Sequence, residues 1–128
     1  MPASVRDGVE QAMARYVHAL DDRDWEALRG VFAEDCTFHM GEAVRGVDNI
    51  VAALSRHSTG APPSRHLVSG LEITEAGEDE VATVSDWAVL VPSGDAWVVS
   101  RFARHNDRLR RQGDEWVYTE MRITLAGA

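Results

Sequence analysis

The segment from Tyr16 to Phe32 constrains the fold most, because it predicts two amphipathic helices joined at a tight acidic corner. Apolar residues recur at steps of three and four up to Leu20, which predicts a helix over residues 4–20 with Ser4 as its N-cap. Residues 21–23 form the corner. Asp24 then caps a second helix that ends near Ala33, and its buried stripe is Trp25, Leu28, Val31 and Phe32.

The rest of the chain predicts one more helix and several strands. Alternating residues predict a strand over 35–40, with Cys36, Phe38 and Met40 on one face and a return strand beginning near residue 44. A short helix capped by Asp48 runs to about residue 56, and 58–64 is a loop. Long strands follow over 66–75, 81–91, 97–109 and 116–125, with polar turns between them. The order predicts an α+β fold in which a strongly curved antiparallel or mixed sheet wraps three N-terminal helices as a cone, leaving a pocket inside.

Composition excludes several function classes. All thirteen basic residues are arginine, so the chain has no lysine for a Schiff base, for pyridoxal phosphate or for a phosphate-binding loop. A net charge of −8 argues against nucleic acid and anionic membranes as partners. The arginine cluster at 101, 104, 108, 110 and 111 is interpreted as a solvated face or as ion pairs with nearby carboxylates. At 128 residues, we expect a single domain over 1–128.

Other features of the composition limit the cofactors that we expect the chain to bind and the compartment in which we expect to find it. Cys36 is the one cysteine, and we expect it to be a small buried residue. No apolar run is long enough to span a bilayer and no signal pattern opens the chain, so we expect a cytoplasmic protein. The histidines at 18, 39 and 57 are expected to be exposed or peripheral, and no histidine spacing matches a metal site. We expect no cofactor and no metal.

Several short motifs, in this order and spacing, carry a resemblance to a known family. They are Tyr16-x4-Asp21, Asp24-Trp25-x2-Leu28-x2-Val31-Phe32, Gly46-x3-Ile50, Arg65-His66, and the closing Trp116 and Arg122. The chain thereby resembles the SnoaL-like branch of the NTF2-like superfamily over nearly its whole length. The resemblance implies the curved-sheet cone and a homodimer. It does not fix the function, because the superfamily includes ketosteroid isomerases, scytalone and bile-acid dehydratases, polyketide cyclases, epoxide hydrolases and noncatalytic subunits.

The resemblance assigns candidate catalytic roles to three residues. Asp21 matches the helix aspartate of scytalone dehydratase and His66 matches its strand histidine, while Tyr16 and Asp21 are placed like the tyrosine and aspartate of bile-acid dehydratases. In such a site, His66 is the acid/base, Asp21 orients it, and Tyr16 hydrogen-bonds a developing enolate oxygen. The simpler alternatives stay open: His66 is a structural histidine, Asp21 only ends its helix, and the Tyr16 ring belongs to the core.

Departures from the family leave the substrate open. Met40 stands where ketosteroid isomerases have their aspartate base and scytalone dehydratase has a tyrosine, and the second histidine and the serine of scytalone dehydratase have no equivalents here. His105 falls near the pocket asparagine of that enzyme and shares a predicted face with Trp97. Asp86 is a possible second pocket carboxylate, with a surface or dimer-face position as the alternative. The predicted pocket residues are Trp25, Phe38, Met40, Asp86, Trp97 and His105.

The sequence supports two classes of function. The first is a cofactor-independent lyase, isomerase or cyclase that acts on a small hydrophobic, oxygenated molecule. The second is a noncatalytic small-molecule-binding or assembly protein, for which the missing polar groups around Met40 are the main argument. A histidine and an aspartate within hydrogen-bonding distance inside an apolar pocket would favour the enzyme.

Overall fold

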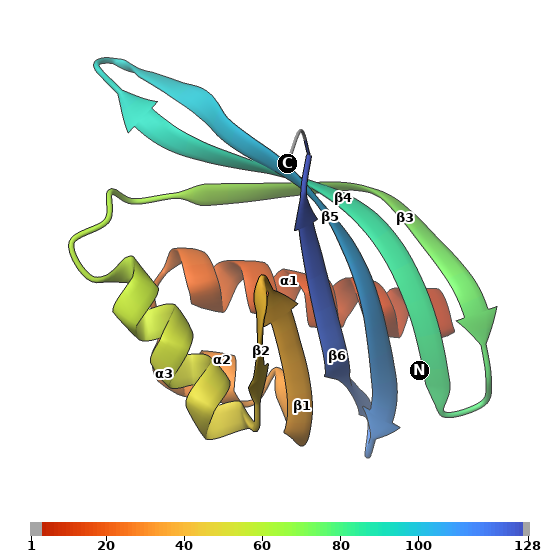
Figure 1. The fold of residues 1–128 in the computed structure, drawn as a ribbon. Helices are drawn as coiled ribbons and strands as arrows, with labels where there is room; N and C mark the ends of the chain where they lie inside the picture. The colour runs from red at the N-terminus through yellow and green to blue at the C-terminus, as the bar shows by residue number, and fades with distance from the viewer. Residues whose placement is uncertain (1–3, 127–128) are drawn as a thin grey trace.

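The computed structural model describes residues 4–126, and this part of the chain forms three helices and six strands (Figure 1). The helices are α1 (Val5–Asp21), α2 (Trp25–Arg29) and α3 (Val47–Ser58). The strands are β1 (Phe32–Met40), β2 (Glu42–Arg45), β3 (Arg65–Ala76), β4 (Glu80–Ser93), β5 (Ala96–Gln112) and β6 (Glu115–Leu125). Residues 1–3 and 127–128 lie outside the described residues, so the expected domain limits of 1–128 stay a prediction.

The six strands form one open, mixed sheet in the order β2-β1-β6-β5-β4-β3. The last four strands make the predicted antiparallel meander, and β1 joins it by pairing in parallel with β6. The sheet curves strongly, and the three helices lie on its concave side (Figure 1). The predicted α+β cone is therefore confirmed. Within residues 4–126, no helix is long and apolar enough to cross a membrane.

Helix α1 has the start that its sequence predicts. The Ser4 side chain accepts a hydrogen bond from the Asp7 backbone, and Asp7 reciprocates, which makes a capping box. Its buried stripe packs against the sheet, and Gly8 leaves room for the Trp116 ring, since a Cβ at that position would overlap it. The corner after α1 turns at Arg23, whose φ of 55° is left-handed. The Arg23 guanidinium donates to the carbonyls of Ala61 and Pro62, and so ties this corner to the loop before β3.

Two helix predictions are wrong in detail. Helix α2 ends at Arg29 and not near Ala33, because the chain from Phe32 onward pairs with β6, and the Tyr118 amide donates to the Val31 carbonyl. This long-range pairing overrides the helical spacing of the apolar residues. Asp24 does cap α2, but Asp48 does not cap α3: the N-cap is Gly46, and Asp48 lies in the first turn, where it pairs with Arg29.

The two faces of the sheet differ in burial. On β4, the side chains of residues 81, 83, 85, 87 and 89 are buried against the helices, while the intervening ones point to the convex face. On the convex face, Leu67 and Phe102 are 60% and 58% exposed, and both lie opposite Ala88 on the strand between them. The concave face therefore carries the core and the site, and the convex face carries an apolar row open to solvent.

Candidate active site

The site is organised by a buried carboxylate and imidazole. Asp21 is the last residue of α1, and His66 is the second residue of β3. Nδ1 of His66 lies 2.6 Å from Oδ1 of Asp21, and the backbone N–H of His66 donates to Oδ2 over 3.0 Å. The two side chains are only 13% and 6% exposed, respectively. The predicted meeting of Asp21 and His66 is thus confirmed, and one carboxylate fixes both the ring and its strand.

The local sequence explains why these groups meet. His66 pairs with Val89 across β3 and β4, on the concave face, while the next residue, Leu67, points outward. The last turn of α1 crosses beneath this strand end (Figure 1). Because Asp21 accepts two hydrogen bonds there, a short acidic side chain is needed at the end of the helix. A carboxylate on one ring nitrogen fixes the tautomer and leaves Nε2 available to a ligand.

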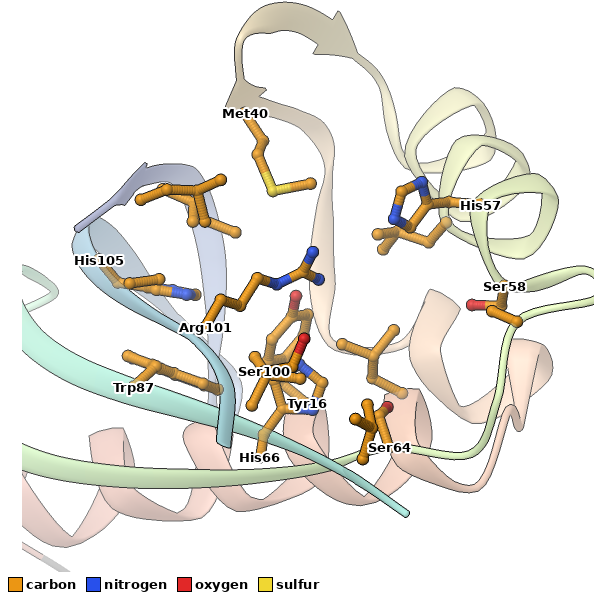
Figure 2. A pocket seen from close by; sticks show the side chains of 18 of the residues that line it. Tyr16, Met40, His57, Ser58, Ser64, His66, Trp87, Ser100, Arg101 and His105 are labelled. Carbon is orange, nitrogen blue, oxygen red and sulfur yellow. The ribbon is translucent and has the colours of Figure 1, made fainter. Parts of the chain in front are cut away.

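A cavity of about 250 Å³ opens beside this pair, between the helices and the concave face of the sheet. Figure 2 shows His66, Trp87 and His105 on one side and Met40 and His57 on the other. Most of the wall is apolar, formed by residues that include Leu20, Phe38, Met40, Leu54, Val89 and Ile123. Its charged and titratable groups are Arg23, His57, His66, Arg101 and His105, together with the Tyr16 hydroxyl. An apolar cavity with a few convergent polar groups is the usual form of a small-molecule site.

Tyr16 connects the core to the cavity. Its ring is buried and makes edge contacts with Phe32 and Trp87, at centroid distances of 5.9 and 5.7 Å. Its hydroxyl points into the cavity (Figure 2). Burial, followed by the nearby carboxylates of Asp107 and Asp21, raises the pKa of Tyr16 well above its ordinary value. The hydroxyl therefore keeps its proton at neutral pH and is a hydrogen-bond donor to an oxygen in the cavity.

A second histidine and carboxylate lie deeper in the wall. His105 stacks on Trp87 with ring centroids 4.1 Å apart, and its Nδ1 lies 3.5 Å from Oδ2 of Asp107 without hydrogen-bond geometry. Oδ1 of Asp107 and the hydroxyl of Tyr118 are also buried without a hydrogen-bond partner among the described residues. Burial raises the pKa of Asp107, although the contacts with His105 and with the Arg122 backbone oppose this shift. Asp107 therefore favours its neutral form more than an ordinary aspartate does.

The structure places six of the nine predicted site residues at the cavity. Asp21 reaches it through His66, and the wall itself includes Tyr16, Phe38, Met40, His66 and His105. His57, expected to be peripheral, also lines it. Whether any of these residues is catalytic stays a prediction.

The other three predicted pocket residues do not line the cavity. Trp25 begins the short helix α2 and packs against the core. Asp86 lies on the convex face, where it pairs with Arg104 over 2.8 Å. Trp97 is displaced by a β-bulge: Val89 pairs with Arg101, but Leu90 already pairs with Val99. One extra residue reverses the faces of a strand, so Trp97 no longer shares the face of His105.

Sequence reasoning missed three residues of the site, namely Arg101, Trp87 and Asp107. The clustering of Arg101 with four other arginines predicts a solvated face, but Arg101 alternates in phase with Ala103 and His105, and that spacing places it on the concave face. Asp107 continues the same alternation. Among residues 4–126, no cluster of three or more His, Cys, Asp or Glu side chains is arranged to hold a metal ion.

The fold and this cavity define the class. An open curved sheet around three helices, with a cavity in its concave face, is the NTF2-like fold, and an NTF2-like protein with a cystatin-like fold from Novosphingobium aromaticivorans matches with a TM-score of 0.83 and 20% identity, over 96% of this chain and 82% of that one. The SnoaL-like domain family matches residues 2–122. The chain belongs to this family.

Further solved structures are similar to most of the chain. ActVI-ORFA from Streptomyces coelicolor has a TM-score of 0.87 and 21% identity, over 98% of this chain and all of that one. A protein from Catenulispora acidiphila in complex with S-DNPA has a TM-score of 0.84 and 25% identity, over 94% of this chain and 92% of that one. No curated protein sequence matches the chain. The similarities establish the family and the fold, and the function has to be argued from the site.

Proposed function

We propose that the protein is a cofactor-independent acid/base enzyme, of the dehydratase, isomerase or cyclase type, that acts on a small hydrophobic, oxygenated molecule. The observation that carries the proposal is the 2.6 Å contact between His66 and Asp21 at the wall of an apolar cavity. A structural histidine would have no need to present its other ring nitrogen to a cavity. The complex of the Catenulispora acidiphila relative with S-DNPA supports a ligand-binding role for the fold.

The geometry supports one division of labour. Nε2 of His66 removes a proton from a carbon next to a carbonyl, while Asp21 holds Nδ1–H and so keeps the lone pair on Nε2. The Tyr16 hydroxyl donates a hydrogen bond to the developing enolate oxygen. The imidazolium then returns the proton, to carbon in an isomerisation or to a leaving hydroxyl in a dehydration. Every step uses groups of this chain alone.

The common first step can be tested before the substrate is known. 2-Tetralone, a bicyclic ketone with acidic C–H bonds, is incubated with the protein in D2O, and NMR follows the exchange of these protons. We expect exchange faster than in buffer, and a loss of about a hundredfold or more in His66→Gln. His18→Gln, on the exposed side of α1, is the matched control and should exchange at the wild-type rate. Exchange no faster than in buffer, or unchanged in His66→Gln, would refute the proposal.

A noncatalytic ligand-binding protein is the second candidate. The apolar wall around Phe38 and Met40 favours it, because these two side chains offer no polar group of their own to a reacting atom. In that case 2-tetralone binds without any acceleration of exchange, and His66→Ala leaves its affinity unchanged. The exchange assay, together with calorimetric titration of the wild type and of His66→Ala with 2-tetralone, separates the two candidates.

A homodimer is also proposed. The exposed row that includes Leu67 on β3 and Phe102 on β5 supports it, because large apolar side chains gathered on one face of a sheet favour burial against a second copy.

A further inference from the structure

The charge of the cavity wall is opposite to that of the chain. The whole chain carries 21 acidic against 13 basic residues, for a net charge of −8. The wall nevertheless includes two arginines and three histidines and no aspartate or glutamate. The nearest carboxylates are engaged behind it, with Asp21 held by His66 and Asp107 buried against His105. Among residues 4–126, the cavity of this acidic protein is therefore lined by basic side chains and by no acidic ones.

Arg101 extends its side chain into this space. It lies on β5 opposite Val89, a concave-face position that alternates in phase with Ala103 and His105. Figure 2 shows its guanidinium extending into the cavity, between Met40 and the Tyr16 hydroxyl. Solvent still reaches the side chain, so it lies at the mouth and not in the core. The position allows one end of a bound molecule to meet the guanidinium while the remainder lies against the apolar wall.

The guanidinium has no protein partner in the part of the chain that the structure describes. The other arginines of β5 each pair with a carboxylate, and the N–O distances are 2.8 Å for Arg104–Asp86, 3.4 Å for Arg108–Glu75, 3.8 Å for Arg110–Asp35 and 3.4 Å for Arg111–Asp79. Arg23, also at the cavity, donates to backbone carbonyls. Arg101 makes no hydrogen bond or ion pair with residues 4–126, which leaves its donors free for a ligand.

We propose that Arg101 binds a carboxylate of the substrate, and that the substrate is a hydrophobic ring system with an acidic side arm. The inference rests on the proposed function, since it assigns the ligand of the same cavity. A guanidinium presents two parallel N–H donors that match a carboxylate. Phosphate sites usually gather several donors, from lysine, backbone amides or a helix N-terminus. Arg101 supplies one guanidinium without further donors of this kind beside it among the described residues, which favours a carboxylate as the ligand.

This anchor has a consequence for the chemistry. With the acidic arm at the mouth, the ring of the substrate lies along Trp87 and the apolar wall, toward His66 and Tyr16. Arg101 then determines which end of the molecule enters first and which carbon reaches Nε2 of His66. We expect it to act in binding and orientation and to exchange no proton with the substrate.

The test compares the binding of two probe molecules that have nearly the same shape. 2-Naphthylacetate and 2-naphthylacetamide differ in charge and hardly in size, and calorimetric titration gives the affinity of each. We expect the wild type to bind the acid at least about tenfold more tightly than the amide. Arg101→Gln should lose this preference by weakening the acid alone. Arg101→Lys should retain part of it, and Arg104→Gln, on the convex face, should retain all of it.

Each other outcome refutes a defined part of the argument. If the wild type binds the acid and the amide equally, or if Arg101→Gln weakens both by the same factor, the carboxylate assignment is wrong, while the cavity stands as a ligand site. If neither probe binds, both the assignment and the ligand-binding role of the cavity are refuted. If 2-naphthylmethylphosphonate binds about tenfold more tightly than the acid, the ligand is a phosphate and not a carboxylate.

Discussion

Replacing Asp21 tests both the stability and the chemistry of the site. In the wild type, its carboxylate accepts one hydrogen bond from the His66 ring and one from the His66 backbone, in a region that is almost fully buried. A buried hydrogen bond to a charged group is worth about 1.5–3 kcal/mol, and the backbone bond adds about 1 kcal/mol. Asp21→Ala removes both and leaves two buried donors unpaired. We expect it to lose about 3–4 kcal/mol of unfolding free energy.

Asp21→Asn separates the role of the carboxylate in the chemistry from its role in folding. The amide oxygen can still accept from the His66 backbone, but the amide nitrogen must then face Nδ1 as a donor. The ring responds by moving its proton to Nε2, so that the nitrogen left to the cavity becomes a donor. We expect this variant to lose only about 1–2 kcal/mol and yet to exchange 2-tetralone no faster than His66→Gln.

Two measurements check these expectations. Urea unfolding gives the stabilities, with Asp22→Asn as the control, because that exposed side chain makes no hydrogen bond among the described residues and its loss should change stability by less than about 0.5 kcal/mol. Long-range 15N NMR across a pH series identifies the protonated ring nitrogen of His66. A wild-type ring with its proton on Nε2, or an Asp21→Ala variant that loses less than about 1 kcal/mol, would contradict the reasoning.

Three further results are expected elsewhere in the fold. Gly8→Ala improves helix propensity but should lower the melting temperature, because its methyl group overlaps Trp116. Burial raises the pKa of Asp107, so the unfolded chain releases this proton at lower pH and the folded state loses stability as pH rises above about 4. Urea unfolding at a series of pH values should therefore show Asp107→Asn gaining stability relative to the wild type as the pH rises above about 4; no pH dependence of the difference would contradict this. Phe102→Ser should convert the proposed dimer to a monomer in light scattering; an unchanged mass would exclude the Leu67 face as the interface.

Sequence reasoning succeeded where local patterns and the resemblance pointed the same way. The caps at Ser4 and Asp24 depend on side chains next to the amides they serve, so they could be predicted from neighbours alone. The contact of Asp21 with His66 spans 45 positions, and it could be predicted because the two residues match the helix aspartate and the strand histidine of one family member. In this case the resemblance supplied the long-range information that periodicity lacks.

The errors arise where distant pairing decides the local structure. The spacing of Val31 and Phe32 suits a helix. The chain leaves the helix and begins β1 at Phe32 because both residues pair with Tyr118 on β6. Regular alternation of side chains along β5 predicts Trp97 on the same face as His105. The bulge between Val99 and Arg101 adds one residue, and nothing in the local sequence marks it. Such a shift depends on the partner strand, which the sequence of β5 does not contain.

The two histidine and carboxylate pairs of the site differ in how completely they are hydrogen-bonded. Asp21 has a donor for each oxygen, whereas Oδ1 of Asp107 has none among the described residues. Burial outweighs the opposing contacts with His105 and the Arg122 backbone, so it raises the pKa of Asp107 and favours the neutral carboxyl group behind Tyr16 and His105. A raised pKa lowers the fraction of Asp107 that carries a negative charge, and so reduces its repulsion of an anion at Arg101. The incomplete hydrogen bonding of the inner pair therefore supports the same ligand as the unpaired arginine at the mouth.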